Sequence, residues 1–190
     1  MEIKRYLWNS NEATDAIKKD LPVILLKCPL CIPAMTNWTL ERLNQVLNPN
    51  FKCDVLASYT HRFLYMDESK NVNGYNLVSQ TEKVSMSFNE YYNYIKSINV
   101  TSSSQSFPNY FFQQGLVAEM GPLILEEYKK FSLETALYYK KIGNWDELTN
   151  NLLLCGKTGF VTPVHFDEQE NLFAQLNGMK RVRLFHPDNW

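Results

Sequence analysis

The chain has 190 residues and a formal net charge of −1, and 45% of its residues are apolar and 14% aromatic. This composition supports a hydrophobic core and excludes a disordered chain. The near-neutral charge, with no basic stripe, excludes the usual pattern of a nucleic-acid binder. No apolar run approaches the length of a membrane span, and the charged N-terminus lacks the apolar core of a secretory signal. We therefore expect a cytoplasmic and nuclear protein with reduced cysteines.

The first third of the chain is expected to mix short strands and helices. An apolar run predicts a strand over 23–26. Leucines at helical spacing predict a helix over 39–47, which Asn48-Pro49-Asn50 ends. Alternating residues predict a strand over 51–59, and a further short strand is expected over 63–65.

The middle of the chain carries a helix signal and a strand signal. Ser87 and Glu90 form the S-x-x-E pattern of a capping box, so a helix should follow. Residues 109–113 read as a strand. Pro122 sits where a helix begins, and 123–139 should form one or two helices, broken near Phe131-Ser132.

From Asn150 the pattern changes to short strands separated by turns. The residues 156–159 predict one turn, and Asn177-Gly178 is a strong two-residue hairpin signal. The strands expected around these turns are 151–155, 160–167, 172–176 and 180–185. A mixed α/β part thus leads into antiparallel β-structure.

Cys28 and Cys31 form a C-x-x-C pattern. A redox or zinc role would be expected to involve a second C-x-x-C or C-x-x-H pattern, and none follows in the sequence. We therefore interpret the two cysteines as a buried pair in a loop.

His165 and Asp167 form an H-x-D pattern inside the predicted strand 160–167. Side chains two residues apart on a strand point to the same face, so an imidazole and a carboxylate would converge on one point. They would supply two of the three ligands of the 2-His-1-carboxylate triad, which holds Fe(II) and leaves positions open for a co-substrate and oxygen. Alone the pattern is weak, because surface His and Asp residues often share this spacing by chance.

The predicted hairpin places Lys180 on one face with three apolar residues, Phe173, Val182 and Leu184. A lysine on an apolar face is costly unless an anion meets it, and a dicarboxylate co-substrate would be such an anion. Alternatively, Lys180 lies near the hairpin end and extends its ammonium into water. The spacing alone favours neither interpretation.

The segment from Asn151 to Trp190 closely resembles the JmjC and cupin-like oxygenases, in particular the asparaginyl hydroxylases that act on hypoxia-inducible factor. The resemblance rests on T-P-x-H-x-D-E-Q from Thr162, then Asn171, F-A-Q and G-x-K-R at unbroken spacing. It covers most of the chain from about Leu21. The upstream matches are ASYTHRFLY from Ala57, FQQ from Phe112 and WDELTN from Trp145.

The resemblance implies an α+β fold, in which a mixed N-terminal region leads into an incomplete double-stranded β-helix, the jelly roll of the cupin-like JmjC core. We expect an N-terminal extension over 1–20, the mixed α/β part of the domain over 21–149, and the first jelly-roll strands over 150–190. A jelly roll hides its edges with about eight strands. A chain that stops after the first few would leave unpaired edges, so we expect a fragment or a truncated form.

The resemblance also implies roles for five residues of the last segment. His165 and Asp167 would bind iron. Thr162, Asn171 and Lys180 would hold 2-oxoglutarate, with Lys180 pairing its far carboxylate. The cofactor would be Fe(II), and 2-oxoglutarate and O₂ would be co-substrates.

Two residues further upstream would contact a peptide substrate by the same resemblance. These are Tyr65 and Gln113, which the sequence alone would describe as a packed aromatic and a polar strand residue. The complete protein would hydroxylate a protein side chain, namely asparagine in an ankyrin-repeat or transcription-factor segment. Neither nucleic acid nor a membrane is expected as a partner, and the homodimer of the full-length family is not expected from this chain.

The chain departs from the family pattern at two places. Phe111 stands where the family has a Tyr whose hydroxyl contacts the co-substrate, and the neighbouring Tyr110 would replace it only if the register slipped. The second iron-binding His of the family lies beyond the end of this sequence. We interpret His186 as a surface loop residue and His61 as a residue that packs within its own segment, so neither is expected to substitute.

Two other functions remain open at this point. One is a JmjC oxygenase that acts on Lys, Arg or His side chains, which the Tyr65 and Gln113 matches argue against. The other is a non-catalytic chain that binds a peptide but holds no iron, which the missing third ligand favours.

Overall fold

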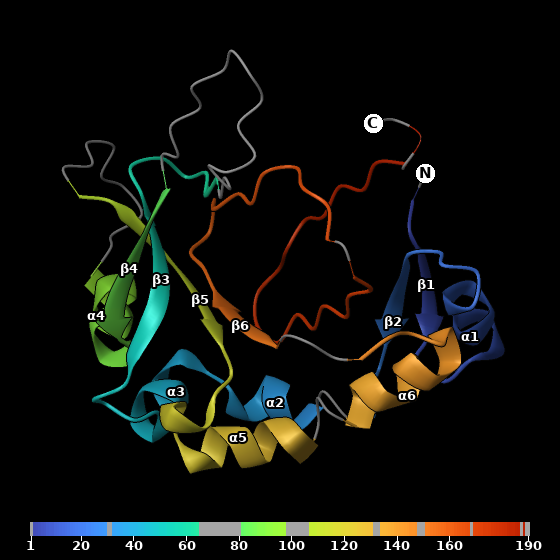
Figure 1. The fold of residues 1–190 in the computed structure, drawn as a ribbon, viewed down its shortest axis with the longest axis horizontal. Helices are drawn as coiled ribbons and strands as arrows, with labels where there is room; N and C mark the ends of the chain where they lie inside the picture. Colours follow the sequence, from blue (N-terminus) through green and yellow to red (C-terminus); the bar gives the residue numbers. More distant parts are fainter. Residues whose placement is uncertain are drawn as a thin grey trace. The chain divides into compact units, whose positions relative to one another are not determined.

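The computed structural model describes residues 2–29, 32–64, 81–97, 107–130, 134–147, 151–167, 169–186 and 188. These form two compact units, drawn in Figure 1, and each is described by itself. Unit 1 consists of Met1–Thr39, Lys130–Trp145 and Gln169–Trp190, and unit 2 consists of Leu40–Lys129 and Asp146–Glu168. No helix among the described residues is long and apolar enough to cross a membrane.

Unit 2 is built on a four-stranded sheet with the order β4-β3-β5-β6. All of its neighbouring strands are antiparallel. Strand β3 lies in the middle and pairs Val55 with Phe112 of β5, which fixes the register of the two strands. The strands are β3 (Lys52–Ser58), β4 (Thr81–Ser87), β5 (Asn109–Gly115) and β6 (Leu152–Cys155).

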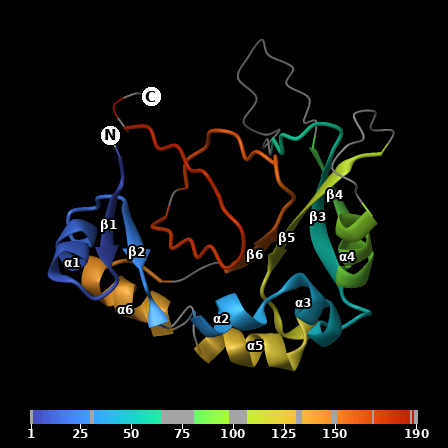
Figure 2. The same ribbon diagram turned by 180° about the vertical axis from the view of Figure 1, so that it is seen from behind.

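Helix α4 (Phe88–Ser97) covers one face of this sheet with aromatic side chains. Phe112 of β5 is fully buried, and its ring centroid lies 5.2 Å from that of Phe88 and 5.3 Å from that of Tyr91. The hydroxyl of Tyr91 donates to the carbonyl oxygen of Cys155 in β6, at 2.6 Å. Burial of aromatic side chains contributes most of the stability of such a core. Within unit 2, Figures 1 and 2 show α4 on one side of the sheet and residues 156–167, which follow β6, on the other.

The start of α4 is fixed by a capping box. The backbone N–H of Glu90 donates to Ser87 Oγ at 3.2 Å, and the backbone N–H of Ser87 donates to Glu90 Oε2 at 2.6 Å. Two backbone donors that the helix leaves unpaired are thereby satisfied. This confirms the sequence prediction of a helix after Ser87.

Unit 2 also contains helices α3 (Leu40–Val46) and α5 (Pro122–Tyr128). Arg42 of α3 forms an ion pair with Glu127 of α5. Pro122 occupies the start of α5, where a missing backbone N–H costs nothing.

Unit 1 contains a parallel pair of strands, β1 (Lys4–Leu7) and β2 (Val23–Leu26), joined by α1 (Asn11–Ile17). The side chain of Ser10 caps α1 by accepting from the backbone N–H of Ala13 at 3.1 Å. Unit 1 also holds α2 (Ile32–Asn37) and α6 (Glu134–Gly143).

Helix α6 packs against α1 within unit 1. The hydroxyl of Tyr139, which is almost fully buried, donates to the carbonyl oxygen of Trp8 at 3.1 Å. The Trp8 ring also meets Tyr138 edge to face, with centroids 5.6 Å apart.

Several predicted elements are confirmed in these two units. The strands over 23–26 and 51–59, the helix over 39–47 and the strand over 151–155 appear within one or two residues of their predicted bounds. Two helices, α5 and α6, cover the range predicted over 123–139, and the predicted break at Phe131-Ser132 lies outside the described residues. The sequence prediction missed β1, α1, α2, β4 and the short 3-10 helix Ala118–Met120.

The strands predicted over 160–167, 172–176 and 180–185 are wrong, because the described residues there form no strand. The chain turns at Asn177-Gly178 with a positive φ of 73° at Gly178, but no ladder forms on either side. An isolated two-stranded hairpin is at best marginal in water, and these segments stay exposed. The strand predicted over 63–65 is also wrong for residues 63 and 64, which are the described part of that range. The residue before them, Arg62, forms an isolated bridge to Val161.

Replacing Ser87 with alanine removes the hydroxyl that accepts from Glu90 N–H. We expect the free energy of unfolding to fall by about 1 kcal/mol, measured by urea denaturation. Ser97→Ala removes a hydroxyl at the other end of the same helix and should cost less than about 0.5 kcal/mol. Equal losses in the two variants would contradict a capping role for Ser87.

Hydrogen bonds from Lys52 Nζ and from the backbone and hydroxyl of Ser87 lower the pKa of Glu90 to about 2. An unperturbed glutamate titrates near about 4.3, so ionised Glu90 stabilises the fold above that pH, and the stabilisation is lost as the pH falls toward 2. Glu90→Gln keeps the capping pattern and removes the charge. We expect the Tm difference between wild type and Glu90→Gln to be largest above about pH 5 and to shrink toward pH 2. A difference that does not change with pH would contradict this account.

Candidate functional site

The chain after β6 returns to the sheet at Val161. It first turns at Gly159, which has a φ of 92°, a value that favours glycine. The backbone N–H of Val161 then donates to the carbonyl oxygen of His61 at 2.8 Å, and the N–H of Phe63 donates to the carbonyl oxygen of Val161 at 3.1 Å. These two bonds attach the loop that carries the H-x-D pattern to the segment that follows β3.

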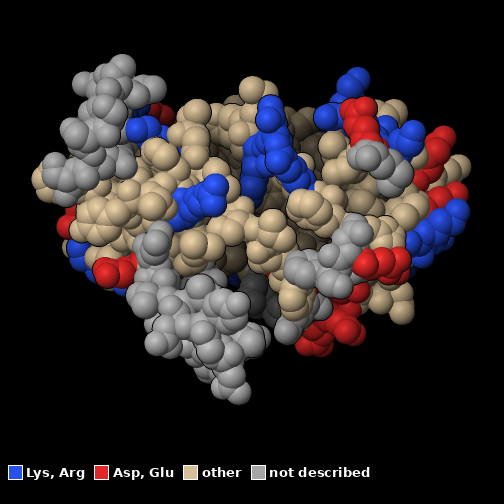
Figure 3. Space-filling model, turned by 90° about the horizontal axis from the view of Figure 1, so that it is seen from above, with Lys and Arg blue, Asp and Glu red and all other residues tan. Residues whose placement is uncertain are grey.

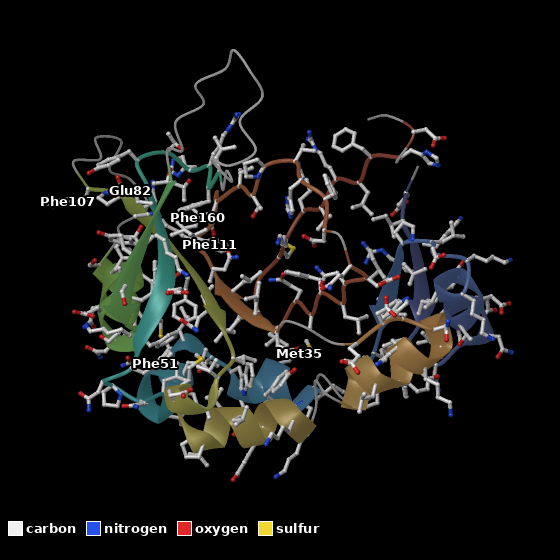
Figure 4. The ribbon with its side chains drawn as sticks, in the orientation of Figure 1. Met35, Phe51, Glu82, Phe107, Phe111 and Phe160 are labelled. Carbon is white, nitrogen blue, oxygen red and sulfur yellow. The ribbon has the colours of Figure 1, made fainter. Side chains whose placement is uncertain are left out.

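The aromatic rings of Phe63, Phe111 and Phe160 pack together next to these two hydrogen bonds. The ring centroid of Phe63 lies 5.4 Å from that of Phe111 in β5 and 4.9 Å from that of Phe160. Figure 4 shows Phe111 and Phe160 next to one another. A Cβ on Gly156 would approach the Phe111 ring to 3.1 Å, so a glycine lets the loop pack this closely. Phe111 therefore contributes an apolar wall, without the tyrosine hydroxyl that the resemblance implies at this position.

Tyr110 does not replace that hydroxyl, because its side chain points to the opposite face of β5. Its ring packs edge to face with Tyr94 of α4, with centroids 4.8 Å apart, and its backbone N–H donates to the Tyr94 hydroxyl at 3.0 Å. The register pairs Phe111 with Leu56 and Tyr110 with Ala57. The register slip that would have exchanged the two residues is therefore absent.

His165 and Asp167 lie in a loop rather than on a strand, yet the structure brings their side chains together. His165 Nδ1 lies 2.8 Å from the carbonyl oxygen of Pro163. A carbonyl oxygen only accepts, so Nδ1 carries the proton and the lone pair of the neutral ring is on Nε2. Nε2 faces Asp167 Oδ1 at 3.8 Å, and the two side chains are 59% and 53% exposed. When the ring is neutral, the loop thus presents its acceptor nitrogen beside a carboxylate.

This pair fits two positions of a metal site. Two ligand atoms about 2.1 Å from one ion and at right angles lie about 3 Å apart, so a small rotation of either side chain would bring both onto one ion. A backbone carbonyl that holds the other ring nitrogen is the usual outer partner of a metal-binding histidine. Among the residues that the structure describes, no three His, Cys, Asp or Glu side chains come together as a metal site.

The second H-x-D pattern, His186 and Asp188, has the opposite arrangement. The backbone N–H of Asp188 donates to His186 Nδ1 at 3.3 Å, so the proton of the neutral ring is on Nε2. Asp188 Oδ2 lies 3.3 Å from the same Nδ1, and both side chains are strongly exposed. This agrees with the interpretation of His186 as a surface loop residue.

The remaining predicted residues of unit 2 lie near this loop or on the same sheet face. Thr162 is exposed and directly follows Val161. Gln113 is half-buried on β5, two residues from Phe111, and therefore on the same face of the sheet. Tyr65 lies outside the described residues.

Asn171 and Lys180 belong to unit 1 and are described with it. Asn171 is exposed. The Nζ of Lys180 lies 4.3 Å from the ring centroid of Phe173, so these two side chains meet although no hairpin forms. Partial burial of the ammonium lowers the pKa of Lys180. By its accessible surface Lys180 is nevertheless exposed, and none of the described carboxylates forms an ion pair with it.

Cys53 and Cys155 are thiols on the α4 side of the sheet. Burial raises the pKa of Cys53 to about 11 and that of Cys155 to about 12. A thiol with so high a pKa is a poor nucleophile at neutral pH, so neither cysteine is a candidate for catalysis. The predicted C-x-x-C pair is not tested, because Cys31 lies outside the described residues.

The sequence prediction missed two features of unit 2. One is the carbonyl of Pro163, which sets the tautomer of His165, and only the T-P-x-H spacing hinted at it. The other is a cavity of about 530 Å³ near the end of β3 and the starts of β4 and β5, where Figure 4 labels Glu82. None of the predicted site residues that the structure describes lines it, and its lining consists of Ala57, Tyr59, Thr60, Glu82, Val84, Pro108 and Tyr110.

Figure 3 draws the charged side chains on one face of the molecule. On the face drawn in Figure 3, Lys and Arg side chains form several separate groups among uncharged residues. The loop with His165 and Asp167 is therefore the candidate site that the described residues support best.

A model of the Cupin-like domain family matches residues 9–190. The mixed α/β architecture with an antiparallel sheet is consistent with that match, although the described strands do not close a jelly roll. The match spans nearly the whole chain, including the loop that presents His165 and Asp167. The chain belongs to the cupin-like domain family.

Proposed function

We propose that this chain carries part of the active site of an Fe(II)- and 2-oxoglutarate-dependent oxygenase that hydroxylates a protein side chain. The substrate we propose is asparagine in an ankyrin-repeat or transcription-factor segment. One observation carries the proposal: the carbonyl oxygen of Pro163 holds Nδ1 of His165, and Nε2 of the same ring lies 3.8 Å from the carboxylate of Asp167, in a chain of the cupin-like family. This family includes 2-oxoglutarate oxygenases, and JmjC-type members typically bind Fe(II) and 2-oxoglutarate.

Iron and 2-oxoglutarate would supply the oxidising power, since decarboxylation of the co-substrate to succinate and CO₂ accompanies transfer of one oxygen atom to the substrate. The residues of this chain would bind and orient. His165 and Asp167 would hold the metal, and the Pro163 carbonyl would keep the imidazole in the tautomer that binds it. The rings of Phe111 and Phe160 would exclude water from one side of the site.

Thr162, Asn171 and Lys180 would bind 2-oxoglutarate in this proposal. The ammonium of Lys180 is partly buried against Phe173, and an incoming carboxylate would stabilise its charge. Gln113 and Tyr65 would contact the peptide substrate. Gln113 shares a sheet face with Phe111, which is compatible with that role.

A second candidate function is a peptide-binding chain without catalysis. The observation that favours it is that the described residues hold no group of three metal-binding side chains. Binding of a peptide without turnover would distinguish this function from the first.

With Fe(II), ascorbate, 2-oxoglutarate and an ankyrin-type asparagine peptide, we expect succinate to form only where a third metal ligand completes the pair of His165 and Asp167. His165→Ala should abolish this turnover, because it removes the nitrogen that binds the metal. His186→Ala is the matched control, since it removes an exposed histidine of the same H-x-D pattern whose Nδ1 is occupied, and should leave turnover unchanged.

Equal turnover in wild type and His165→Ala would contradict the proposed site. Peptide binding by a folded wild-type chain without any succinate would favour the non-catalytic function. Peptides with lysine, arginine or histidine in place of asparagine complete the panel, and a preference for one of them would contradict the proposed substrate.

Replacing Lys180 with methionine keeps the length of the side chain and removes its charge. We expect the affinity for 2-oxoglutarate to fall about tenfold or more, because a charge-assisted hydrogen bond is lost. Calorimetric titration of 2-oxoglutarate into the metal-loaded chain measures this. Arg181→Met removes the neighbouring cation and should change the affinity little, so equal losses would indicate a general effect of charge.

A further inference from the structure

A buried polar network lies at the end of β3 beside the start of β5. Asn109 is fully buried and stands directly opposite Ser58 in the β3–β5 ladder. Its Nδ2 donates to the carbonyl oxygen of Thr60 at 3.0 Å and reaches that of Ser58 at 3.4 Å. The amide of Asn109 therefore satisfies carbonyl groups at the point where β3 ends and its ladder stops.

Two hydroxyls continue this network into the turn that follows β3. Ser58 Oγ donates to the carbonyl oxygen of Arg62 at 2.9 Å. Thr60 Oγ1 lies 3.1 Å from both the carbonyl oxygen and the backbone N–H of Arg62, so it can donate to the first and accept from the second. The backbone N–H of Thr60 donates to Ser58 Oγ at 3.2 Å. Side chains, rather than helix or sheet bonds, thus set the path of residues 58–62.

The loop with His165 and Asp167 is attached to unit 2 at this turn. The carbonyl oxygen of His61 and the backbone N–H of Phe63 flank Arg62, and both bond to Val161. Thr162 follows Val161 directly, and His165 lies four residues after it. A change in the path of residues 58–62 would therefore move Val161 and the start of the loop.

Breaking some of the hydrogen bonds in this network lowers the stability of the turn. A buried polar group that loses its partner costs about 1–3 kcal/mol, so a path of the turn that breaks these hydrogen bonds is disfavoured. The aromatic contact between Phe63 and Phe160 packs the two segments but does not fix their register. Hydrogen bonds with defined partners do fix it, which makes the network a better determinant of loop position than the apolar contacts.

We propose that Asn109, Ser58 and Thr60 form a positioning network that holds the loop with His165 and Asp167 in place through the His61–Val161–Phe63 backbone bonds. The part of this inference that concerns metal binding rests on the proposed function. None of the three residues would touch the metal or the substrate.

The substitution Thr60→Val tests the network with little risk of unfolding, because the side chain of Thr60 is exposed. Valine has the shape of threonine but lacks the hydroxyl. We expect the amides of Val161 and Phe63 to exchange with solvent at least tenfold faster in Thr60→Val. We also expect Mn²⁺ to bind about tenfold more weakly at His165, the effect typical of losing an outer partner of a metal site. Thr60→Ser restores the hydroxyl and should restore both values.

The matched control is Thr36→Val in unit 1, which removes another exposed threonine hydroxyl bonded to a backbone carbonyl, that of Ile32 at 3.1 Å. It should change neither exchange nor Mn²⁺ affinity. Tm values of all variants, measured alongside, separate positioning from general unfolding.

Unchanged exchange of Val161 in Thr60→Val would overturn the inference. So would faster exchange with unchanged Mn²⁺ affinity, because the network would then hold the turn without positioning the ligands. A wild-type chain that binds no Mn²⁺ would contradict the proposed function instead, and the exchange of Val161 would still decide whether the network holds the loop.

Discussion

Strand β3 is hydrogen-bonded on both sides, to β4 and to β5, and the register of β3 with β5 determines which side chains face α4 and which face the candidate site. A shift of one residue would exchange the two faces of β5. The burial of Phe112 against α4 opposes such a shift, because it would expose this ring and bury Gln113 in its place. The same register keeps Phe111 on the opposite face of β5.

The candidate site depends on this sheet although none of its proposed ligands lies on a strand. The loop after β6 reaches the sheet and the turn after β3 through Val161 and the aromatic contacts of Phe160. Beyond that point the Pro163 carbonyl orients the ring of His165. The order of dependence runs from the β3–β5 register to the turn after β3, then to Val161, and finally to the imidazole. Binding sites are commonly carried by loops that a rigid scaffold positions in this way.

The sequence predicted the elements whose signals are local. The capping box at Ser87 and Glu90 predicted the start of α4 because its hydrogen bonds form within four residues. The parallel pairing of β1 and β2 was missed, because it joins residues about twenty positions apart and leaves no short-range pattern. The strands expected around Asn177-Gly178 did not form, because alternation describes a strand only when a neighbouring strand pairs with it.

The sequence predicted that two residues of the candidate site converge, but it placed them on a strand, which is wrong. The H-x-D spacing indicated that His165 and Asp167 converge, and they do, but a loop and not a strand brings them to 3.8 Å. The contact between Lys180 and Phe173 was likewise expected from a hairpin and arises without one. The tautomer of His165 could not be predicted from spacing, because it depends on where a backbone carbonyl points.

A measurement of which ring nitrogen of His165 carries the proton is the most direct test of the proposed metal site. Long-range ¹⁵N–¹H spectra of the chain, labelled at its histidines, distinguish the protonated nitrogen of each ring. In a metal-free sample at neutral pH, the account predicts a proton on Nδ1 of His165 and on Nε2 of His186. On addition of Mn²⁺, the signals of His165 should broaden first and those of His186 should remain. A proton on Nε2 of His165, or equal broadening of both rings, would contradict the claim that this loop is built to bind a metal.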